Sequence, residues 1–240
     1  MSMAVGVPAL IPTTRMVTGA HTSITVAEIT LGAFPRGAVL VLSDAGGLDR
    51  SAQVMNLLAE HGYETLAVDL CGRNHESYWI TLMLERLAER GWQTEQIGVL
   101  GYHGAALLAL RTATRHRLGA AVSLDIPQCA LCLPAIDQSA TQLQTPWLGL
   151  SGAAEADSPA ALLAAHWDRR HRAGLVHSRF VSYRGVPEHF LLDSRDTAAH
   201  AAAFDSWQRT VEWLDARVVP RLTPRSLAWR SRLRSATGSP

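Results

Sequence analysis

The chain has 240 residues, of which 48% are hydrophobic and 18% are charged, and its formal net charge is +1. This balance excludes intrinsic disorder over most of the chain, and near-neutrality argues against a nucleic-acid-binding protein that works through a global basic field. Lysine is absent, which excludes Schiff-base chemistry and a P-loop lysine. The length predicts one domain, or two small ones, with ample buried core.

The sequence shows no sign of secretion or membrane insertion. Three cysteines, Cys71, Cys129 and Cys132, cannot form a disulfide framework. The N-terminus lacks the charged start of a signal peptide, and no apolar run approaches the ~18 residues that span a membrane. We therefore expect a cytoplasmic protein whose partner is a small-molecule substrate rather than nucleic acid or membrane, and we leave a homodimer open.

The predicted elements alternate along the chain. Two β-branched segments, 15–19 and 23–31, come first. Short apolar runs typical of buried strands then alternate with segments whose apolar residues recur at helical spacing. The predicted strands are 37–44, 64–70, 97–102, 119–126, 146–152 and 177–183, and the predicted helices are 49–61, 77–90, 104–116, 159–173 and 197–218. This alternation predicts an α/β fold with a mostly parallel central sheet and helices on both faces.

Ligands of such sheets bind at the carboxyl ends of the strands. The chemistry is therefore expected in the turns that follow Ser43, Leu70, Tyr102, Ile126, Gly152 and Tyr183. Residues 127–145 show no clear periodicity, and we interpret them as a short lid in which Cys129 and Cys132 are small apolar residues.

Charge is distributed unevenly between the last 24 residues and the rest of the chain. Residues 217–240 contain six arginines and no acid, whereas residues 1–216 contain sixteen arginines and 21 acids, for a net charge of −5. The last stretch is also rich in serine, proline and glycine. We interpret residues 1–216 as a single domain and 217–240 as a basic, flexible tail.

The segment Gly101-Tyr102-His103-Gly104-Ala105 has the shape of a nucleophile elbow between a strand and a helix. Such a turn holds its central residue on a strained backbone, and small residues two positions before and after it relieve the crowding. Gly101 and Ala105 meet that requirement. The tip is His103, where serine or cysteine would be expected, so an ordinary strand-to-helix turn is the alternative interpretation.

Four segments in this order resemble the dienelactone hydrolase branch of the α/β-hydrolases, over roughly residues 25–215. They are VLVLSDAGGLDRSAQVMNLLAEHGYETLAVDLCGR, IGVLGYHGAALLAL, PWLGLSGAAEADSP and YRGVPEHFL. The resemblance implies the α/β-hydrolase fold and a hydrolase-type activity, with an elbow, an acid and a histidine in that chain order.

The resemblance also implies roles for individual residues. His189 falls on the family's catalytic histidine, and Glu155 best matches the acid that would orient it. Asp157 is a close competitor for that acid position. Asp44 falls where the family has a glutamate that contacts the nucleophile, so it would face His103 here.

The same resemblance implies a binding pocket around the elbow. The backbone N–H groups of Ala45 and Gly104 would form an oxyanion hole. Arg73 lies in a turn whose surroundings shape the family's substrate pocket. Cys71 and Tyr102 are the remaining candidates for substrate contact.

Histidine at the tip changes the expected chemistry, because an imidazole can attack a carbonyl or act as a base. We therefore expect a lactone, ester or polyketide-like substrate to react by histidine–carboxylate acid–base chemistry. The reaction would be hydrolysis or a cyclisation, isomerisation or elimination. The alternative is a catalytically inactive hydrolase-fold protein that binds a small ligand. No cofactor and no metal are expected: the histidines and carboxylates could hold a divalent ion, but no His-x-His or His-Glu-x-x-His spacing supports one.

Overall fold

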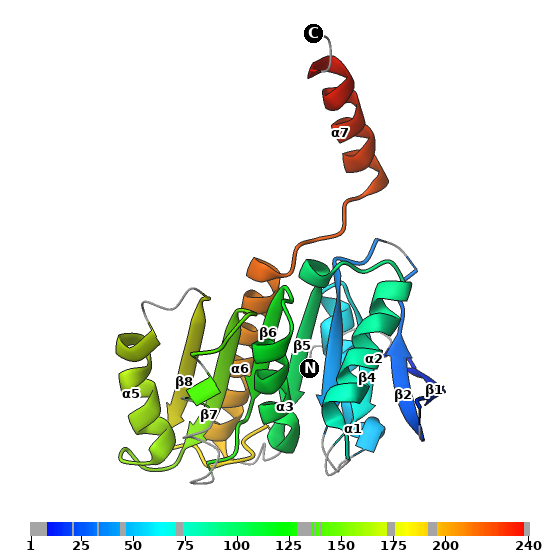
Figure 1. Ribbon diagram of the computed structural model, residues 1–240. Helices are drawn as coiled ribbons and strands as arrows, with labels where there is room; N and C mark the ends of the chain where they lie inside the picture. The colour runs from blue at the N-terminus through cyan, green and yellow to red at the C-terminus, as the bar shows by residue number, and fades with distance from the viewer. Residues whose placement is uncertain are drawn as a thin grey trace, which may run out of the picture.

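The computed structural model describes residues 9–20, 22–32, 34–43, 47–70, 74–128, 136, 138–139, 141–171, 176–191 and 196–237. These residues form a twisted eight-stranded sheet between two layers of helices, with one further helix standing apart (Figure 1). The predicted α/β architecture with a mostly parallel central sheet is confirmed.

The sheet has the strand order β1-β2-β4-β3-β5-β6-β7-β8. Its first two strands pair antiparallel, and β2 also runs antiparallel to β4, whereas all pairs from β4 to β8 are parallel. The strands are β1 Thr13–Thr18, β2 Ser23–Ile29, β3 Gly37–Ser43, β4 Tyr63–Asp69, β5 Ile97–Tyr102, β6 Ala120–Leu124, β7 Trp147–Ala153 and β8 Ser178–Arg184.

Helices cover both faces of this sheet. Three of them, α2, α3 and α5, share one core cluster with the sheet, whereas α1 and α6 contribute to the cluster on the other face. Side chains that alternate along β3 divide between the two clusters, as Leu40 and Val41 do, because successive strand residues point to opposite faces. The helices are α1 Gly47–Glu60, α2 Glu76–Glu89, α3 Ala106–Arg115, α5 Pro159–His171, α6 Thr197–Arg217 and α7 Pro224–Thr237.

The turn from β5 into α3 brings the helix unusually close to the strand. A short 3-10 turn at His103–Ala105 joins the two elements. A Cβ atom built on Gly101 would lie 2.3 Å from the Ala105 carbonyl oxygen and 3.1 Å from the Ala109 Cβ. Only glycine fits at this position, as the elbow interpretation of the sequence requires.

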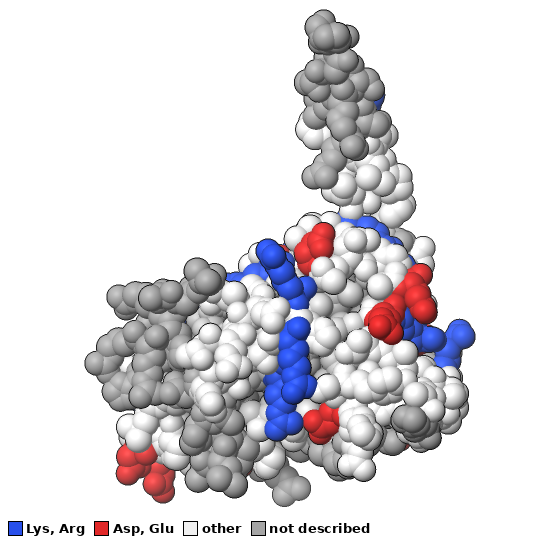
Figure 2. All heavy atoms as spheres, viewed as in Figure 1, with Lys and Arg blue, Asp and Glu red and all other residues white. Residues whose placement is uncertain are grey.

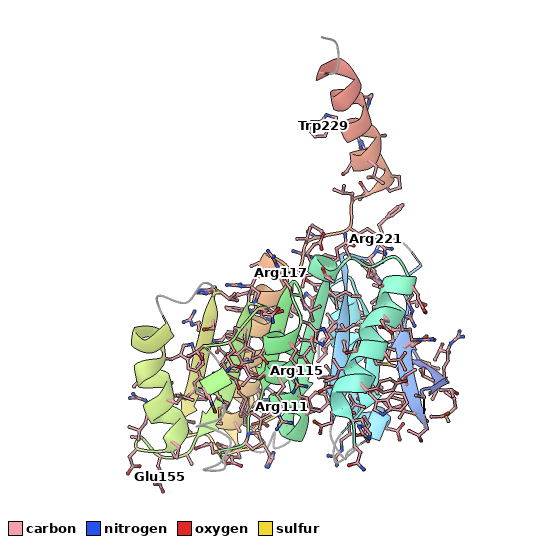
Figure 3. All side chains as sticks on the ribbon, in the orientation of Figure 1. Arg111, Arg115, Arg117, Glu155, Arg221 and Trp229 are labelled. Atoms are coloured by element: carbon pink, nitrogen blue, oxygen red, sulfur yellow. The ribbon has the colours of Figure 1, made fainter. Side chains whose placement is uncertain are left out.

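The segment after α6 continues to contact the domain. Beyond α6, Val218 is buried, and the N–H groups of Val219 and Arg221 donate to the carbonyls of Glu95 and Arg36. Further along, α7 stands away from the domain (Figure 1), and Trp229 on it is exposed (Figure 3). Contacts with the domain thus continue to Arg221, and helix α7 follows.

None of the helices that the structure describes is long and apolar enough to cross a membrane.

Replacing Gly101 by alanine should destabilise the domain by about 3 kcal/mol, because overpacking a close backbone contact typically costs about 1–3 kcal/mol. Urea-induced unfolding measures this difference. The matched control is Gly32→Ala, where an added Cβ meets nothing within 4 Å. Equal stability of the two variants would contradict the close approach at the elbow.

Ending the chain after Leu222 should leave the free energy of unfolding within about 0.5 kcal/mol of the full chain, because surface changes away from packed contacts have effects of that size. Ending it after Arg217 should cost about 2–4 kcal/mol, since burial of Val218 and the stacking of Arg221 3.6 Å over Trp92 are then lost. Thermal unfolding of the two shortened chains beside the full chain tests both expectations. Equal losses from both truncations would show that α7 contributes to the fold.

Candidate active site

Three polar residues from distant parts of the chain meet at the carboxyl edge of the sheet. His103 follows β5, Asp125 follows β6, and His189 lies in the loop after β8. One nitrogen or oxygen atom from each side chain lies within 4.8 Å of the other two. The two histidines predicted from the sequence are therefore brought together, and a carboxylate joins them.

Strand pairing explains why His103 and Asp125 are neighbours. Tyr102 and Leu124 are register partners in the parallel pair β5–β6, so the residues that follow them leave the sheet side by side. The Nδ1 atom of His103 lies 2.9 Å from Oδ2 of Asp125. Both side chains are almost fully buried, with 4% and 1% of their surface exposed.

Asp125 is held in place through its neighbours and through one of its own oxygen atoms. The next residue, Ile126, donates its N–H to Leu150 and accepts a hydrogen bond from the Ser151 hydroxyl. Oδ1 of Asp125 accepts from the backbone N–H of His189 at 3.1 Å. Oδ2 is buried and has no aligned hydrogen-bond partner among the described residues, although it lies beside His103.

The loop that carries His189 is anchored on both sides. It crosses closely over β7, where a Cβ on Gly152 would lie 2.3 Å from the carbonyl oxygen of Pro187. Phe190, directly after the histidine, is buried in a small cluster and packs on the ring of Tyr183. His189 itself is exposed, so it is the member of the cluster that solvent and ligands reach.

Tyr183 also ties β8 to α6. Its hydroxyl donates to Asp205 at 2.8 Å, and Asp205 is in turn bound by the Arg209 guanidinium. Burial, reinforced by the hydrogen bond to Asp205, raises the pKa of the Tyr183 hydroxyl well above its ordinary range. The hydroxyl therefore stays protonated and keeps donating, which fixes the strand from which the His189 loop departs.

Backbone strain is concentrated in the same cluster. Four non-glycine residues in the described part of the chain have a left-handed backbone: His75, His103, Asp125 and His189, with φ of 65°, 50°, 53° and 63°. Three of the four form the cluster. Each such residue costs about 1–2 kcal/mol, and strain of this kind persists at functional sites where the surrounding structure imposes it.

The two imidazoles face each other through like atoms. Their Nδ1 atoms are 3.5 Å apart, and the ring centroids are separated by 5.4 Å. Which Nδ1 carries a proton depends on the tautomer, and Nδ1 of His103 also faces the Asp125 carboxylate at 2.9 Å. A carboxylate beside two imidazoles can stabilise one added positive charge, which is the basis of histidine acid–base catalysis.

The predicted acids lie elsewhere. Glu155 and Asp157 are exposed in the turn after β7, and Glu155 lies at the outer corner of the molecule below α5 (Figure 3). Among the described residues, no contact joins either of these side chains to His103 or His189. The carboxylate that contacts them is Asp125, which the sequence reasoning missed.

A signal for Asp125 was present in the sequence. The turn after Ile126 was among those expected to carry chemistry, but residues 119–126 were all assigned to the strand. The strand ends at Leu124, two residues earlier, and this places Asp125 in the turn. The signal was therefore Asp125 itself, an aspartate at the end of the strand that follows the elbow strand in the sequence.

Several other predicted site residues lie outside the described residues: Asp44, Ala45, Cys71 and Arg73, as do the expected lid residues Cys129 and Cys132. Of the two that are described, Gly104 is exposed directly after His103. Tyr102 is buried, with its hydroxyl 3.1 Å from that of Ser51 and its ring edge-on to His103. Tyr102 thus supports the elbow from the core side.

Other charged features lie away from this cluster. Figure 2 shows arginines in a stripe over α3, where Figure 3 labels Arg111 and Arg115, and Arg111 pairs with Glu76 at 3.3 Å.

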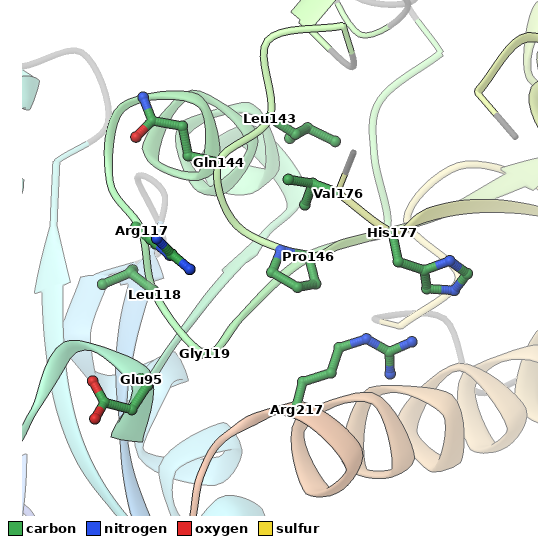
Figure 4. Close-up of a pocket in the computed structure, with 10 residues that line it drawn as sticks. All are labelled: Glu95, Arg117, Leu118, Gly119, Leu143, Gln144, Pro146, Val176, His177 and Arg217. Atoms are coloured by element: carbon green, nitrogen blue, oxygen red, sulfur yellow. The ribbon is translucent and has the colours of Figure 1, made fainter. Parts of the chain in front are cut away.

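A pocket of about 610 Å³, lined by Arg117, His177 and Arg217 among others (Figure 4), lies where β6, β7 and β8 begin. It is therefore at the opposite edge of the sheet from His103, so we do not assign it to the active site.

Comparison with solved structures agrees with this architecture. A structure named as a dienelactone hydrolase, from Klebsiella pneumoniae, is 19% identical, with a TM-score of 0.69 over 85% of this chain and 98% of its own. The esterase domain of a Rhodothermus marinus protein has a TM-score of 0.61 at 11% identity, over 87% of this chain and 100% of that domain. Acylaminoacyl peptidase from Pyrococcus horikoshii has a TM-score of 0.66 at 10% identity, over 87% of this chain, which spans 42% of that longer protein.

At these identities the solved structures establish the fold alone. No curated protein sequence matches the chain. The model of the dienelactone hydrolase family, however, matches residues 79–218, which include His103, Asp125 and His189. The chain belongs to the dienelactone hydrolase family of α/β-hydrolases.

Proposed function

We propose that this protein hydrolyses a small ester or lactone, with Asp125, His103 and His189 acting together as an acid–base relay. The observation that carries the proposal is the contact sequence from the buried carboxylate through His103 to His189, at 2.9 Å and 3.5 Å. Membership in a hydrolase family supplies the reaction class.

The burial of the three residues suggests how their roles divide. His189 is exposed and meets water and substrate, whereas His103 is enclosed between His189 and Asp125. In the productive tautomer, Nδ1–H of His103 faces Oδ2 of Asp125 at 2.9 Å, and Nδ1–H of His189 is directed at the same carboxylate, which leaves Nε2 of His189 free to accept a proton. His103 then holds the carboxylate in place behind the base rather than attacking the substrate.

The reaction follows from that arrangement. Nε2 of His189 takes a proton from water as the water oxygen attacks the substrate carbonyl. The positive charge that His189 gains is stabilised by the Asp125 carboxylate. The tetrahedral intermediate then collapses, and the proton passes to the departing alkoxide. One water is consumed, and the products are a carboxylic acid and an alcohol, joined in one molecule when the substrate is a lactone.

The relay predicts that His103→Ala, His189→Ala and Asp125→Asn each lower kcat/KM by about 10²–10⁴, the usual contribution of general acid–base catalysis. A panel of activated esters and five- or six-membered lactones provides the assay. His61→Ala, at an exposed turn, is the matched control and should leave activity unchanged. Hydrolysis that is indifferent to all three changes would contradict the proposal. If the wild type turns over no carbonyl substrate but binds one tightly, the protein is a ligand-binding member of the family instead.

The elbow geometry yields a second prediction. His103→Ser places a hydroxyl on the strained turn (φ 50°). This position is next to both Asp125 and His189. We expect this variant to be labelled covalently by a fluorophosphonate at least about 10-fold faster than the wild type, because an adjacent base activates the serine. Mass spectrometry identifies the labelled residue. The double variant His103→Ser with His189→Ala is the control; equal labelling of both variants would show that His189 does not act as the base.

A further inference from the structure

We propose that His103, Asp125 and His189 form a binding site for a divalent transition-metal ion, with Nδ1 of each histidine and Oδ2 of the aspartate as ligands. Two imidazoles and one carboxylate are a donor set that suits Zn²⁺, Co²⁺ and similar ions. The proposal uses the same residues as the proposed hydrolysis but does not depend on it, because binding is measured without substrate.

The distances between the donor atoms fit such an ion. A tetrahedral Zn²⁺ with bonds of about 2.0–2.1 Å holds its ligands about 3.3 Å apart. The observed separations are 2.9 Å between His103 Nδ1 and Asp125 Oδ2, and 3.5 Å between the two Nδ1 atoms. One ligating atom of each of the three residues lies within 4.8 Å of those of the other two.

The state of Asp125 is the second, independent observation. Its residue is 1% exposed, yet Oδ2 has no aligned hydrogen-bond partner among the described residues. Oδ1 is already engaged by the His189 N–H, which fixes the carboxylate and leaves Oδ2 as the monodentate donor. Oδ2 lies 2.9 Å from His103 Nδ1 without forming an aligned hydrogen bond, and a cation shared by the two atoms would satisfy both of them, because buried polar atoms are normally paired.

The placement of His189 leaves the ion accessible. His189 is exposed, whereas the other two ligands are buried, so an ion bound by all three would sit at the mouth of the cluster. Its remaining coordination position would face the side from which ligands reach His189. Three protein ligands with one open position are the arrangement of accessible metal sites rather than of closed structural ones.

Metal binding and the proposed relay exclude each other, because the ion would occupy the Nδ1 atoms that carry protons in the relay. Zn²⁺ should therefore inhibit the hydrolysis, and a chelator should restore it. Activation by Zn²⁺ would support the metal site while contradicting the acid–base relay. Failure of the relay and failure of the metal site are thus separable.

The test is calorimetric titration of the chelator-treated full-length protein with Zn²⁺. We expect one equivalent to bind to the wild type, and binding to weaken at least about 10-fold in His189→Ala, Asp125→Ala and His103→Ala, as loss of one ligand of three implies. His189→Ala is the key variant because the side chain is exposed and its removal should leave folding intact. The exposed His61→Ala and His75→Ala are the matched controls and should bind as the wild type does.

A second variant tests the same assignment by the gain of a spectroscopic signal rather than by a loss of binding. Co²⁺ added to His189→Cys should produce a sulfur-to-cobalt charge-transfer band that is absent from the wild type, because a thiolate at this position would ligate the ion directly. Absence of that band, or Zn²⁺ affinity that is the same in His189→Ala as in the wild type, would overturn the proposal and place any bound ion elsewhere on the chain.

Discussion

The site depends on the parallel pairing of β5 with β6. Because Tyr102 is opposite Leu124, the two strands release His103 and Asp125 at the same point of the sheet edge. A shift of one residue in this register would turn successive side chains to opposite faces and separate the imidazole from the carboxylate. The central strands that enforce the register are fully buried, so the register is strongly specified.

Close backbone contacts at two glycines also position the site residues. Gly101 lets α3 approach β5 closely beside the left-handed turn at His103, and Gly152 lets the His189 loop cross β7. Each glycine removes a Cβ that would collide with a carbonyl oxygen at 2.3 Å. The strain at His103, Asp125 and His189 is thus imposed by packing nearby, which is how strained functional residues are kept in place.

Histidine at the elbow tip changes what the family's fold can do. A serine or cysteine there would form an acyl-enzyme, whereas the two proposals assign proton transfer or cation binding to the two imidazoles and the carboxylate. Both proposals draw on the same feature, a buried carboxylate whose Oδ2 lies 2.9 Å from His103. A histidine can stand at the tip because the elbow constrains the backbone and not the side chain.

Local patterns in the sequence were sufficient for the α/β fold, its six parallel strands and the strand-to-helix turn at His103. Apolar runs and helical spacing are short-range signals, and the elbow needs only small residues at fixed offsets. Both histidines could also be placed at the carboxyl edge, since each follows a predicted strand. The acid could not be chosen this way: Glu155 and Asp157 follow a predicted strand and were candidates by resemblance, whereas Asp125 fell inside the predicted strand 119–126 and follows β6 only in the structure. Only the tertiary structure selected Asp125, because the contact depends on the register between strands 22 residues apart and on a loop from β8 that closes over both.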